Sequence, residues 1–292
     1  QSSPPALSRI ESMRTQTLVN NTSYQDFTIR ESISDKVNFT LVSPDISLCN
    51  DCLNELLNPL DRRYGYPFIN CTNCGPRYSI IQDIPYDRSM TTMASFQMCE
   101  ACEEEYHDPA NRRFHAQPNA CYQCGPQVWL LSGRDLPASI SDLTLKTQTN
   151  QTVLKKAAIL LKEGAILAIK GLGGFHLACD ATNHDAVTTL RERKRRPNKP
   201  FALMAQDLES VKTFCIFTEE ERLLLEESVR PIVILEKKFP HSISEAVAPH
   251  NKYFGVMLPY TPLHYLLFSF TELQFTALVM TSGNLADEPI VT

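Results

Sequence analysis

Eight of the ten cysteines in the chain fall into four C-x-x-C pairs, and this pattern constrains the fold more than any other feature. In each of two sets the second pair follows the first after 18 residues, a spacing typical of a four-cysteine zinc site. Each C-x-x-C turn can direct two thiolates toward one metal. We therefore predict two structural Zn²⁺ ions, one on each of two sets of ligands: Cys49, Cys52, Cys71 and Cys74, and Cys99, Cys102, Cys121 and Cys124.

The two cysteine sets belong to a module that is duplicated with a period of 50 residues. CNDCLNELLNPLDRRYGYPFINCTNCGP aligns with CEACEEEYHDPANRRFHAQPNACYQCGP, and both share an acidic residue, a proline, paired arginines and a closing Gly-Pro. His107 and His115 are alternative ligands in the second module, but four sulfurs already complete a tetrahedral site. We expect local metal sites, and we interpret the paired arginines as anchors rather than surface charges: Arg62 with Arg63, and Arg112 with Arg113.

Disulfide formation and redox chemistry are the two alternative uses of these cysteines. A secreted disulfide scaffold would suit the sequons at Asn21, Asn38 and Asn150. The N-terminus shows no signal peptide, however, and four C-x-x-C pairs without one are typical of zinc ligands. A redox C-x-x-C is usually single and begins a helix beside a βαβ pattern. The metal interpretation is therefore preferred.

Charge and hydropathy narrow the class of protein further. No run of about 18 apolar residues appears, so no membrane span is predicted, and a cytoplasmic location is the expectation. The net charge of -5 argues against non-specific nucleic-acid binding, which needs a surplus of Lys and Arg. One local exception is the basic run from Arg191 to Lys199.

The composition along the chain divides it into segments. Residues 1–44 resemble a linker, residues 45–84 and 95–131 hold the two zinc modules, and the polar residues 132–150 form a second linker. Residues 151–292 form an α/β domain. The chain starts at Gln1 and ends in an apolar strand-like run, so we interpret both ends as cuts and the last domain as incomplete at its C-terminus.

The α/β prediction depends on alternating helix and strand patterns. Apolar residues at helical spacing begin near Val153 and stop at Gly164, and a short apolar run at 165–169 then leads into a glycine loop. Asn183 and Thr218 look like helix N-caps, the latter with a capping box. Further strand-like runs at 231–235 and 277–280 indicate a mixed, twisted sheet.

Three features of this domain are suited to binding an anion. The loop Lys170–Gly174 follows a strand, so its backbone N–H groups can approach a ligand closely, although a glycine turn between a strand and a helix is more often only a turn. The basic residues 194–196 can neutralise phosphates, although such runs are usually solvated helix ends. Thr281–Asn284 present hydroxyl and amide groups at a strand end, where open α/β sheets bind ligands.

Together these motifs resemble the HypF family of carbamoyltransferases, over about residues 40–292. The resemblance is carried by the duplicated cysteine module and by KGLGGFHLACDA, RERKRRPNKPFALM, GVMLPYTPLHYLL and TSGN-x-x-x-EP. It implies a YrdC-like last domain and an acylphosphatase-like domain upstream of residues 1–44. It also implies a role in nickel–iron hydrogenase maturation.

The resemblance further implies the chemistry and its residues. Carbamoyl phosphate supplies the carbamoyl group, ATP with Mg²⁺ is consumed to form carbamoyl-adenylate, and the group passes to a C-terminal cysteine of a HypE-like acceptor. Lys194 and Arg196 match a K-x-R element, and Ser282 and Asn284 match an S-x-N element. The implied nucleotide and carbamoyl-adenylate site comprises Lys170, Gly173, Gly174, His176, Lys194, Arg196, Ser282 and Asn284.

Two alternative functions stay open at this point. A YrdC-type RNA-binding or tRNA-modification protein, forming threonylcarbamoyl-adenylate, would use the basic run as its contact surface. The zinc modules and the glycine loop, which stands where that family has a Thr-rich segment, disfavour it. The other alternative is an interaction scaffold without activity. His176 is interpreted with equal weight as a ligand contact or a core histidine.

Overall fold

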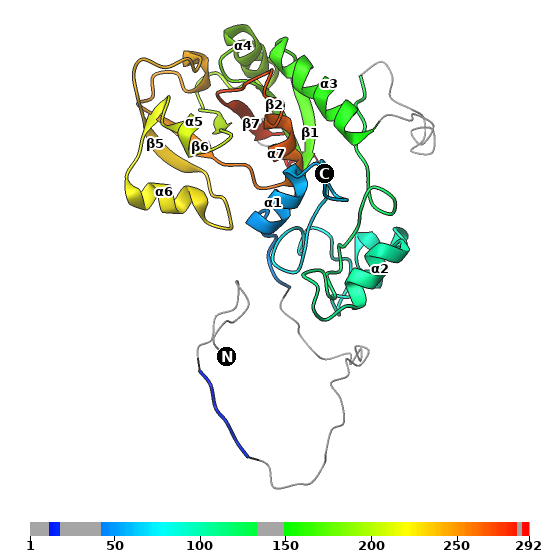
Figure 1. The fold of residues 1–292 in the computed structure, drawn as a ribbon. Coiled ribbons are helices and arrows are strands. Elements are labelled where there is room, and N and C mark those ends of the chain that lie inside the picture. Colours follow the sequence, from blue (N-terminus) through cyan, green and yellow to red (C-terminus); the bar gives the residue numbers. More distant parts are fainter. Residues whose placement is uncertain (1–11, 18–41, 133–148, 285–287, 292) are drawn as a thin grey trace.

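The computed structural model describes residues 12–17, 42–132, 149–284 and 288–291. Most of both predicted linkers lies outside these residues. Two parts are visible in Figure 1. The zinc region, which contains the two predicted zinc modules at residues 45–84 and 95–131, has little regular structure, and the α/β domain is built on one sheet. Among the helices of the described residues, none is long and apolar enough to span a bilayer.

The zinc region contains one α-helix per module. Helix α1 (Asn50–Leu57) and helix α2 (Glu100–His107) each have 8 residues. Each begins directly after the first cysteine of its module, and that cysteine has an extended backbone conformation. Each first C-x-x-C pair therefore spans a helix N-terminus, where the macrodipole favours thiolates. Two 3-10 helices, η1 (Arg88–Met90) and η2 (Thr92–Ser95), lie between the modules.

The α/β domain is a seven-stranded mixed sheet in the order β1-β2-β7-β3-β6-β5-β4, in which β3 and β6 are the parallel pair. The strands are β1 (Leu167–Gly171), β2 (Gly174–Asp180), β3 (Ala202–Met204), β4 (Cys215–Ile216), β5 (Val233–Lys237), β6 (Tyr253–Met257) and β7 (Leu278–Ser282). The helices are α3 (Asn150–Lys162), α4 (His184–Arg193), α5 (Leu208–Val211), α6 (Glu219–Glu226), η4 (Glu245–Val247) and α7 (Pro262–Phe268). The predicted mixed α/β architecture is confirmed.

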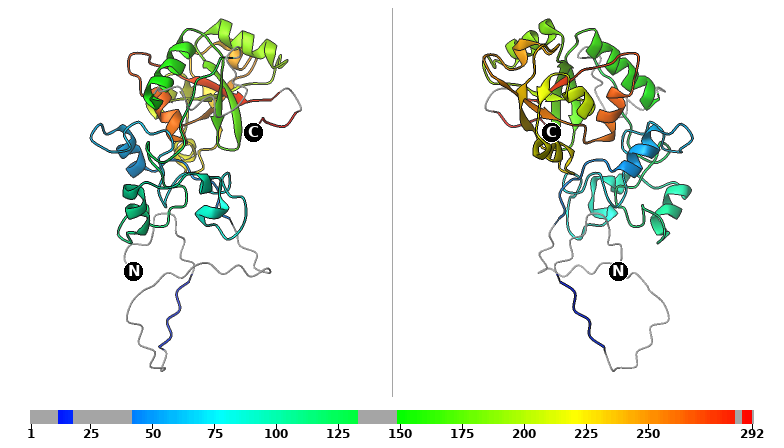
Figure 2. Two further views of the ribbon diagram at one scale, coloured as in Figure 1. Left: turned by 90° about the vertical axis from the view of Figure 1, so that its right-hand side faces the viewer. Right: turned by 60° about the vertical axis from the view of Figure 1, so that its left-hand side comes forward.

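Two apolar cores lie on opposite faces of this sheet. One face packs against α4, α5 and α6, through residues such as Leu190 and Leu225. The other face packs against α3 and α7, and its core continues without a break into the first zinc module through Leu56 and Ile69. In both views of Figure 2 the zinc region lies below the α/β domain. The first module thus shares a hydrophobic core with the α/β domain and is not a separate folding unit.

Several local predictions are met at the level of single residues. Asn183 caps α4, and Thr218 caps α6 through the complete capping box with Glu221. Gly164 follows α3 with a φ of +90°, as a helix-terminating glycine requires.

The glycine loop differs from the expected strand-to-helix turn, because Leu172 and Gly173 form the two-residue turn of the β1–β2 hairpin. Gly173 has a φ of +75°, so a residue with a side chain would be strained there.

Candidate metal centres and nucleotide site

Each predicted cysteine set comes together in a compact cluster. The four sulfurs of Cys49, Cys52, Cys71 and Cys74 lie within 4.8 Å of one another, and so do those of Cys99, Cys102, Cys121 and Cys124. None of the ten cysteines, all of which lie in the described residues, forms a disulfide. Neither predicted histidine alternative, His107 or His115, joins a cluster, because each group of ligand atoms among the described residues consists of four cysteine sulfurs. His107 Nε2 instead lies 3.2 Å from a carboxylate oxygen of Glu103.

The spacing of the sulfurs fits a zinc ion. The Sγ–Sγ distance is 3.7 Å between Cys49 and Cys71 and 3.8 Å between Cys71 and Cys74. The second cluster has 3.7 Å between Cys99 and Cys121. A tetrahedron with Zn–S bonds of about 2.3 Å has edges of about 3.8 Å. The donor set therefore matches a closed tetrahedral thiolate site that leaves no position for a substrate.

The arginine pairs connect the two modules to each other. Arg62 Nη2 lies 2.9 Å from the sulfur of Cys102, and Arg112 Nη1 lies 3.4 Å from the sulfur of Cys52. Arg63 forms an ion pair with Glu105 across the same junction. The interpretation of these arginines as anchors fits these contacts, because each pair reaches from its own module into the other.

The second arginine of each pair also reaches into the other module. Arg113 forms an ion pair with Glu55, the counterpart of the Arg63 pair. Burial alone would raise the pKa of Glu55, but hydrogen bonds and charges of Arg113 and Arg112 hold that pKa below its usual value. Arg63 also donates from Nε to the Ala120 carbonyl at 2.9 Å, and Arg113 donates from Nε to the Asn70 carbonyl at 3.2 Å.

In the α/β domain, Lys194 meets both residues of the predicted S-x-N element. Its Nζ donates to the carbonyl oxygens of Ser282 and Asn284, at 2.6 Å each, and to Asn284 Oδ1 at 3.2 Å. The Ser282 hydroxyl donates to the same amide oxygen at 2.6 Å. Lys194 is 4% exposed, and burial, followed by the charge of Arg196, lowers its pKa. Residues 88 and 90 positions apart thus form one polar network at the end of β7.

Arg196 is placed differently from Lys194. Its guanidinium donates to the carbonyl oxygens of Lys199 and Pro200 and lies 5.3 Å from the centre of the Phe201 ring. Arg191 is also directed inward, with hydrogen bonds to the carbonyls of Ala246 and Val247. Three cations of the basic run therefore bind backbone carbonyls of their own domain, which leaves less charge for an RNA surface.

The predicted residues of the hairpin lie on both sides of its turn. His176 pairs with Ser282 in the antiparallel register of β2 and β7, which places it next to the Lys194 network. A Cβ on Gly174 would lie 3.0 Å from the Val291 carbonyl oxygen, so only glycine admits the segment 288–291 at this point. The Phe175 N–H donates to that same carbonyl at 2.8 Å.

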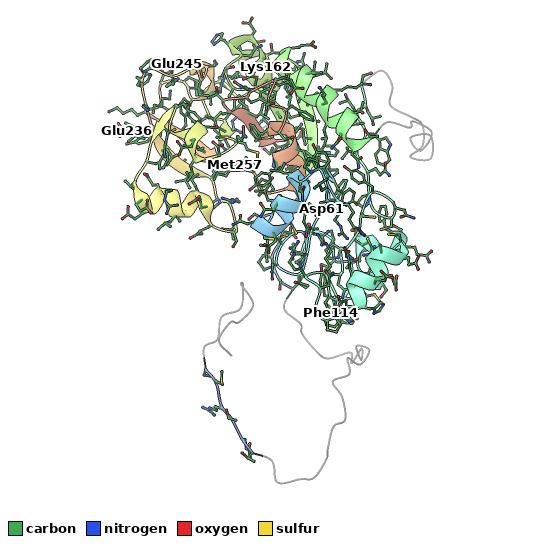
Figure 3. The ribbon with its side chains drawn as sticks, viewed as in Figure 1. Asp61, Phe114, Lys162, Glu236, Glu245 and Met257 are labelled. Atoms are coloured by element: carbon green, nitrogen blue, oxygen red, sulfur yellow. The ribbon has the colours of Figure 1, made fainter. Side chains whose placement is uncertain are left out.

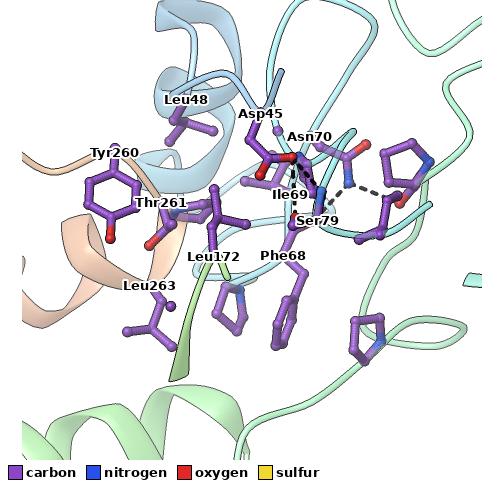
Figure 4. A pocket seen from close by; sticks show the side chains of 18 of the residues that line it. Asp45, Leu48, Phe68, Ile69, Asn70, Ser79, Leu172, Tyr260, Thr261 and Leu263 are labelled. Carbon is purple, nitrogen blue, oxygen red and sulfur yellow. Dashed lines mark hydrogen bonds between the residues drawn. The ribbon is translucent and has the colours of Figure 1, made fainter. Parts of the chain in front are cut away.

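Lys170 and Gly173 instead line a cavity of about 610 Å³ between the hairpin and the first zinc module. Figure 4 shows Leu172 of the hairpin tip facing Phe68, Ile69 and Tyr260 across this space. Lys170 is exposed, and its Nζ lies 5.0 Å from the centre of the Phe175 ring. The predicted nucleotide-site residues are thus not all brought together. Ser282 and Asn284 bind Lys194, Lys170 and Gly173 line the cavity, and Arg196 is directed at the loop around Pro200.

Sequence reasoning missed one buried group near His176. His264 in α7 is fully buried, and its two ring nitrogens have no partner among the described residues. Burial, and then the nearby His176, lower its pKa to about 3. The ring of Tyr260 lies edge-on to it at 4.5 Å. No periodicity in the sequence marks this position, since it follows Thr261 and Pro262 in an ordinary helix start.

Comparison with known proteins agrees with both halves of this architecture. The family model described as "HypF finger" matches residues 48–81 and 98–131, and the one described as "Telomere recombination", a YrdC-type model, matches residues 159–292. Carbamoyltransferase HypF of Synechocystis sp. is 53% identical over 270 residues, which cover 92% of this chain and 33% of that protein. The chain belongs to the HypF family.

Other relatives support the same assignment. The probable carbamoyltransferase HypF of Methanocaldococcus jannaschii is 44% identical over 299 residues, or 98% of this chain and 36% of that protein. The crystal structure of T. kodakarensis HypF has a TM-score of 0.78 at 47% identity, covering 87% of this chain and 32% of that one. Full-length HypF in a phosphate- and nucleotide-bound form has a TM-score of 0.77 at 52% identity, with coverages of 88% and 32%. The chain spans about a third of the length of the HypF relatives it matches.

Proposed function

We propose that this chain is the zinc-binding and adenylate-forming part of a HypF-type carbamoyltransferase. In the proposed reaction water hydrolyses carbamoyl phosphate to carbamate and inorganic phosphate, and an oxygen of carbamate bonds to the α-phosphorus of ATP·Mg²⁺. The bond between the α- and β-phosphates breaks, and pyrophosphate leaves. The thiol sulfur of a cysteine on a HypE-like acceptor then bonds to the carbamoyl carbon and gives up its proton, and the carbon–oxygen bond to phosphate breaks so that AMP leaves. This transfer belongs to nickel–iron hydrogenase maturation in the cytoplasm.

The observation that carries this proposal is the convergence of Lys194 with Ser282 and Asn284. Their network lies where β7 ends, the position at which open α/β sheets present polar groups to ligands. A fixed cation in a partly dry site stabilises developing phosphate charge far better than a mobile surface lysine. The full-length HypF relative was crystallised with phosphate and nucleotide bound, which supports a nucleotide as the ligand.

The network also suggests how Lys194 acts. An ammonium group has three N–H donors, and three oxygens of Ser282 and Asn284 already accept from it. Lys194 therefore holds the loop after β7 in shape and contributes its charge to the site. A direct bond to a phosphate requires the Asn284 amide, at 3.2 Å the longest of the three contacts, to give way.

The two four-sulfur sites are proposed to hold Zn²⁺ in a structural role. Zinc bound by four protein sulfurs has no open coordination position, so it stabilises the fold and does not activate substrate. Here that fold includes the core beneath α3 and α7, since the first module contributes Leu56 and Ile69 to it. We assign no catalytic step to either site.

The test is carbamoyl phosphate-dependent exchange of labelled pyrophosphate into ATP by the whole zinc-loaded protein. Lys194→Ala should lower the exchange rate by about 10²-fold, because it removes the buried cation. Lys199→Ala is the matched control, since this exposed lysine lies in the same basic run and should leave exchange unchanged.

Loss of the fold is checked separately. Zinc content and the melting temperature are measured for both variants, and Ser282→Ala provides a smaller change within the same network. Full exchange activity in a folded Lys194→Ala protein would show that the adenylate site lies elsewhere.

A further inference from the structure

Several contacts between the two zinc modules occur in reciprocal pairs, one from the first module to the second and one from the second to the first. Adding or subtracting the 50-residue period converts the contact Arg62–Cys102 into Arg112–Cys52. Every partner in one contact is replaced by its equivalent in the other. Such reciprocity is the property of an isologous interface, here formed within one chain.

Two further contacts obey the same conversion. The ion pair Arg63–Glu105 becomes Arg113–Glu55. The bond from Arg63 Nε to the Ala120 carbonyl becomes the bond from Arg113 Nε to the carbonyl of Asn70. Unrelated surface ion pairs do not repeat in this way, so the modules form one pseudo-symmetric unit.

The charges of the sites explain why arginine stands at these positions. A divalent metal with four thiolates carries a net charge of about −2. Taking such a charge out of water is costly unless cations compensate for it. Arg63 is 1% exposed and its Nη2 lies 3.5 Å from the sulfur of Cys102, so it is buried beside the second cluster, and guanidinium keeps its charge under such burial. Hydrogen bonds from N–H groups to the sulfurs also make those sulfurs weaker nucleophiles.

We propose that the paired arginines belong to the metal sites as outer hydrogen-bond donors, each pair serving the site of the other module, so that the two metal ions are held as one coupled unit. Arg112, placed by the fold of the second module, faces the sulfurs of the first, and Arg62 faces those of the second. Emptying one site loosens the arginines that stabilise the other. This inference is independent of the proposed adenylate chemistry.

The test measures which site loses zinc when an arginine is changed. The whole zinc-loaded protein is mixed with excess chelator, freed cysteines are alkylated during the reaction, and mass spectrometry maps them to a cluster. Arg112→Lys keeps the charge but loses the planar donor geometry. It should release metal from the Cys49 cluster about 10-fold faster and change the Cys99 cluster less, since outer-donor mutations typically cost 10–100-fold in metal affinity.

Arg62→Lys should give the mirror result, with faster release from the Cys99 cluster. Arg193→Lys, an exposed change on α4, is the matched control and should alter neither rate. Faster release from the module that contains the mutation, or no change in either cluster, would overturn the proposal.

A second variant tests the coupling without changing an arginine. Cys74→Ser empties the Cys49 cluster, and the Cys99 cluster should then release its metal about 10-fold faster than in the unmodified protein. If the Cys99 cluster keeps the release rate of the unmodified protein, the sites are independent and the coupling is wrong.

Discussion

The two zinc modules share one sequence pattern but occupy different environments. In the first module three of the four cysteines are buried and Cys49 is partly exposed, whereas in the second module both Cys99 and Cys124 are partly exposed. The first module is tied to the α/β domain by backbone bonds from Ser47 to Ser228 and from Leu48 to Tyr260. Figure 3 shows Phe114 of the second module at the end of the zinc region farthest from the sheet.

Positions outside the metal pattern account for this difference. Three residues of the first module that are at most 1% exposed correspond, 50 residues later, to smaller or more polar ones: Leu56 to Tyr106, Tyr66 to Ala116, and Ile69 to Asn119. Cysteine spacing thus determines the local fold of a copy, and its apolar positions determine which copy joins the core.

The largest effect is expected when the metal is removed from one module at a time, because only the first module shares the core of the α/β domain. Cys71→Ser should unfold the first module and expose the core shared with α3 and α7, because metal binding and folding are coupled in small zinc units. Cys121→Ser should leave most of that core in place. Hydrogen exchange of α3 and α7 amides measures this, and the first variant should lose far more protection. Equal loss of protection in both variants would contradict the asymmetry.

A single core residue gives a smaller and more local version of the same comparison. Leu56→Ala should cost about 2–5 kcal/mol, because a fully buried leucine leaves a cavity. Tyr106→Ala, at the equivalent position of the second module, removes a partly exposed ring that bonds to Gln117 and should cost less, about 1 kcal/mol. Urea unfolding of both variants measures the difference in the free energy of unfolding. Similar costs would mean that both modules contribute equally to the core.

Whether a feature of the fold or of the site could be predicted from the sequence depends on how far apart in the chain its residues lie. The cysteine clusters follow from local spacing, because all four ligands of a site lie within 26 residues. The helix caps at Asn183 and Thr218 are local too. Lys194 and Ser282 meet only through the sheet, and it was the resemblance to HypF rather than periodicity that associated them.

The contacts of each arginine pair with the other module could not be predicted from the local sequence. The repeat does contain the signal, since Glu55 and Glu105 stand at the same position of each copy, as do the arginine pairs. Whether an arginine meets the glutamate of its own copy or of the other depends on how the copies dock. Arg196 illustrates the same limit, because its direction depends on the loop around Pro200 and on the Phe201 ring.

The smallest expected effect concerns His107, the residue that sequence alone left as an alternative ligand. Its contact with Glu103 joins two well-exposed side chains, with 62% and 53% of their surfaces accessible, and such pairs contribute about 0.5 kcal/mol or less. His107→Ala should therefore leave two zinc ions per protein and change the free energy of unfolding by no more than this. The expectation follows from geometry, because the sulfurs of Cys99, Cys102, Cys121 and Cys124 already form a complete tetrahedral set. Metal analysis decides it: loss of one zinc on this substitution would mean that the second module, unlike the first, uses a nitrogen ligand, and the equivalence of the two sites would no longer hold.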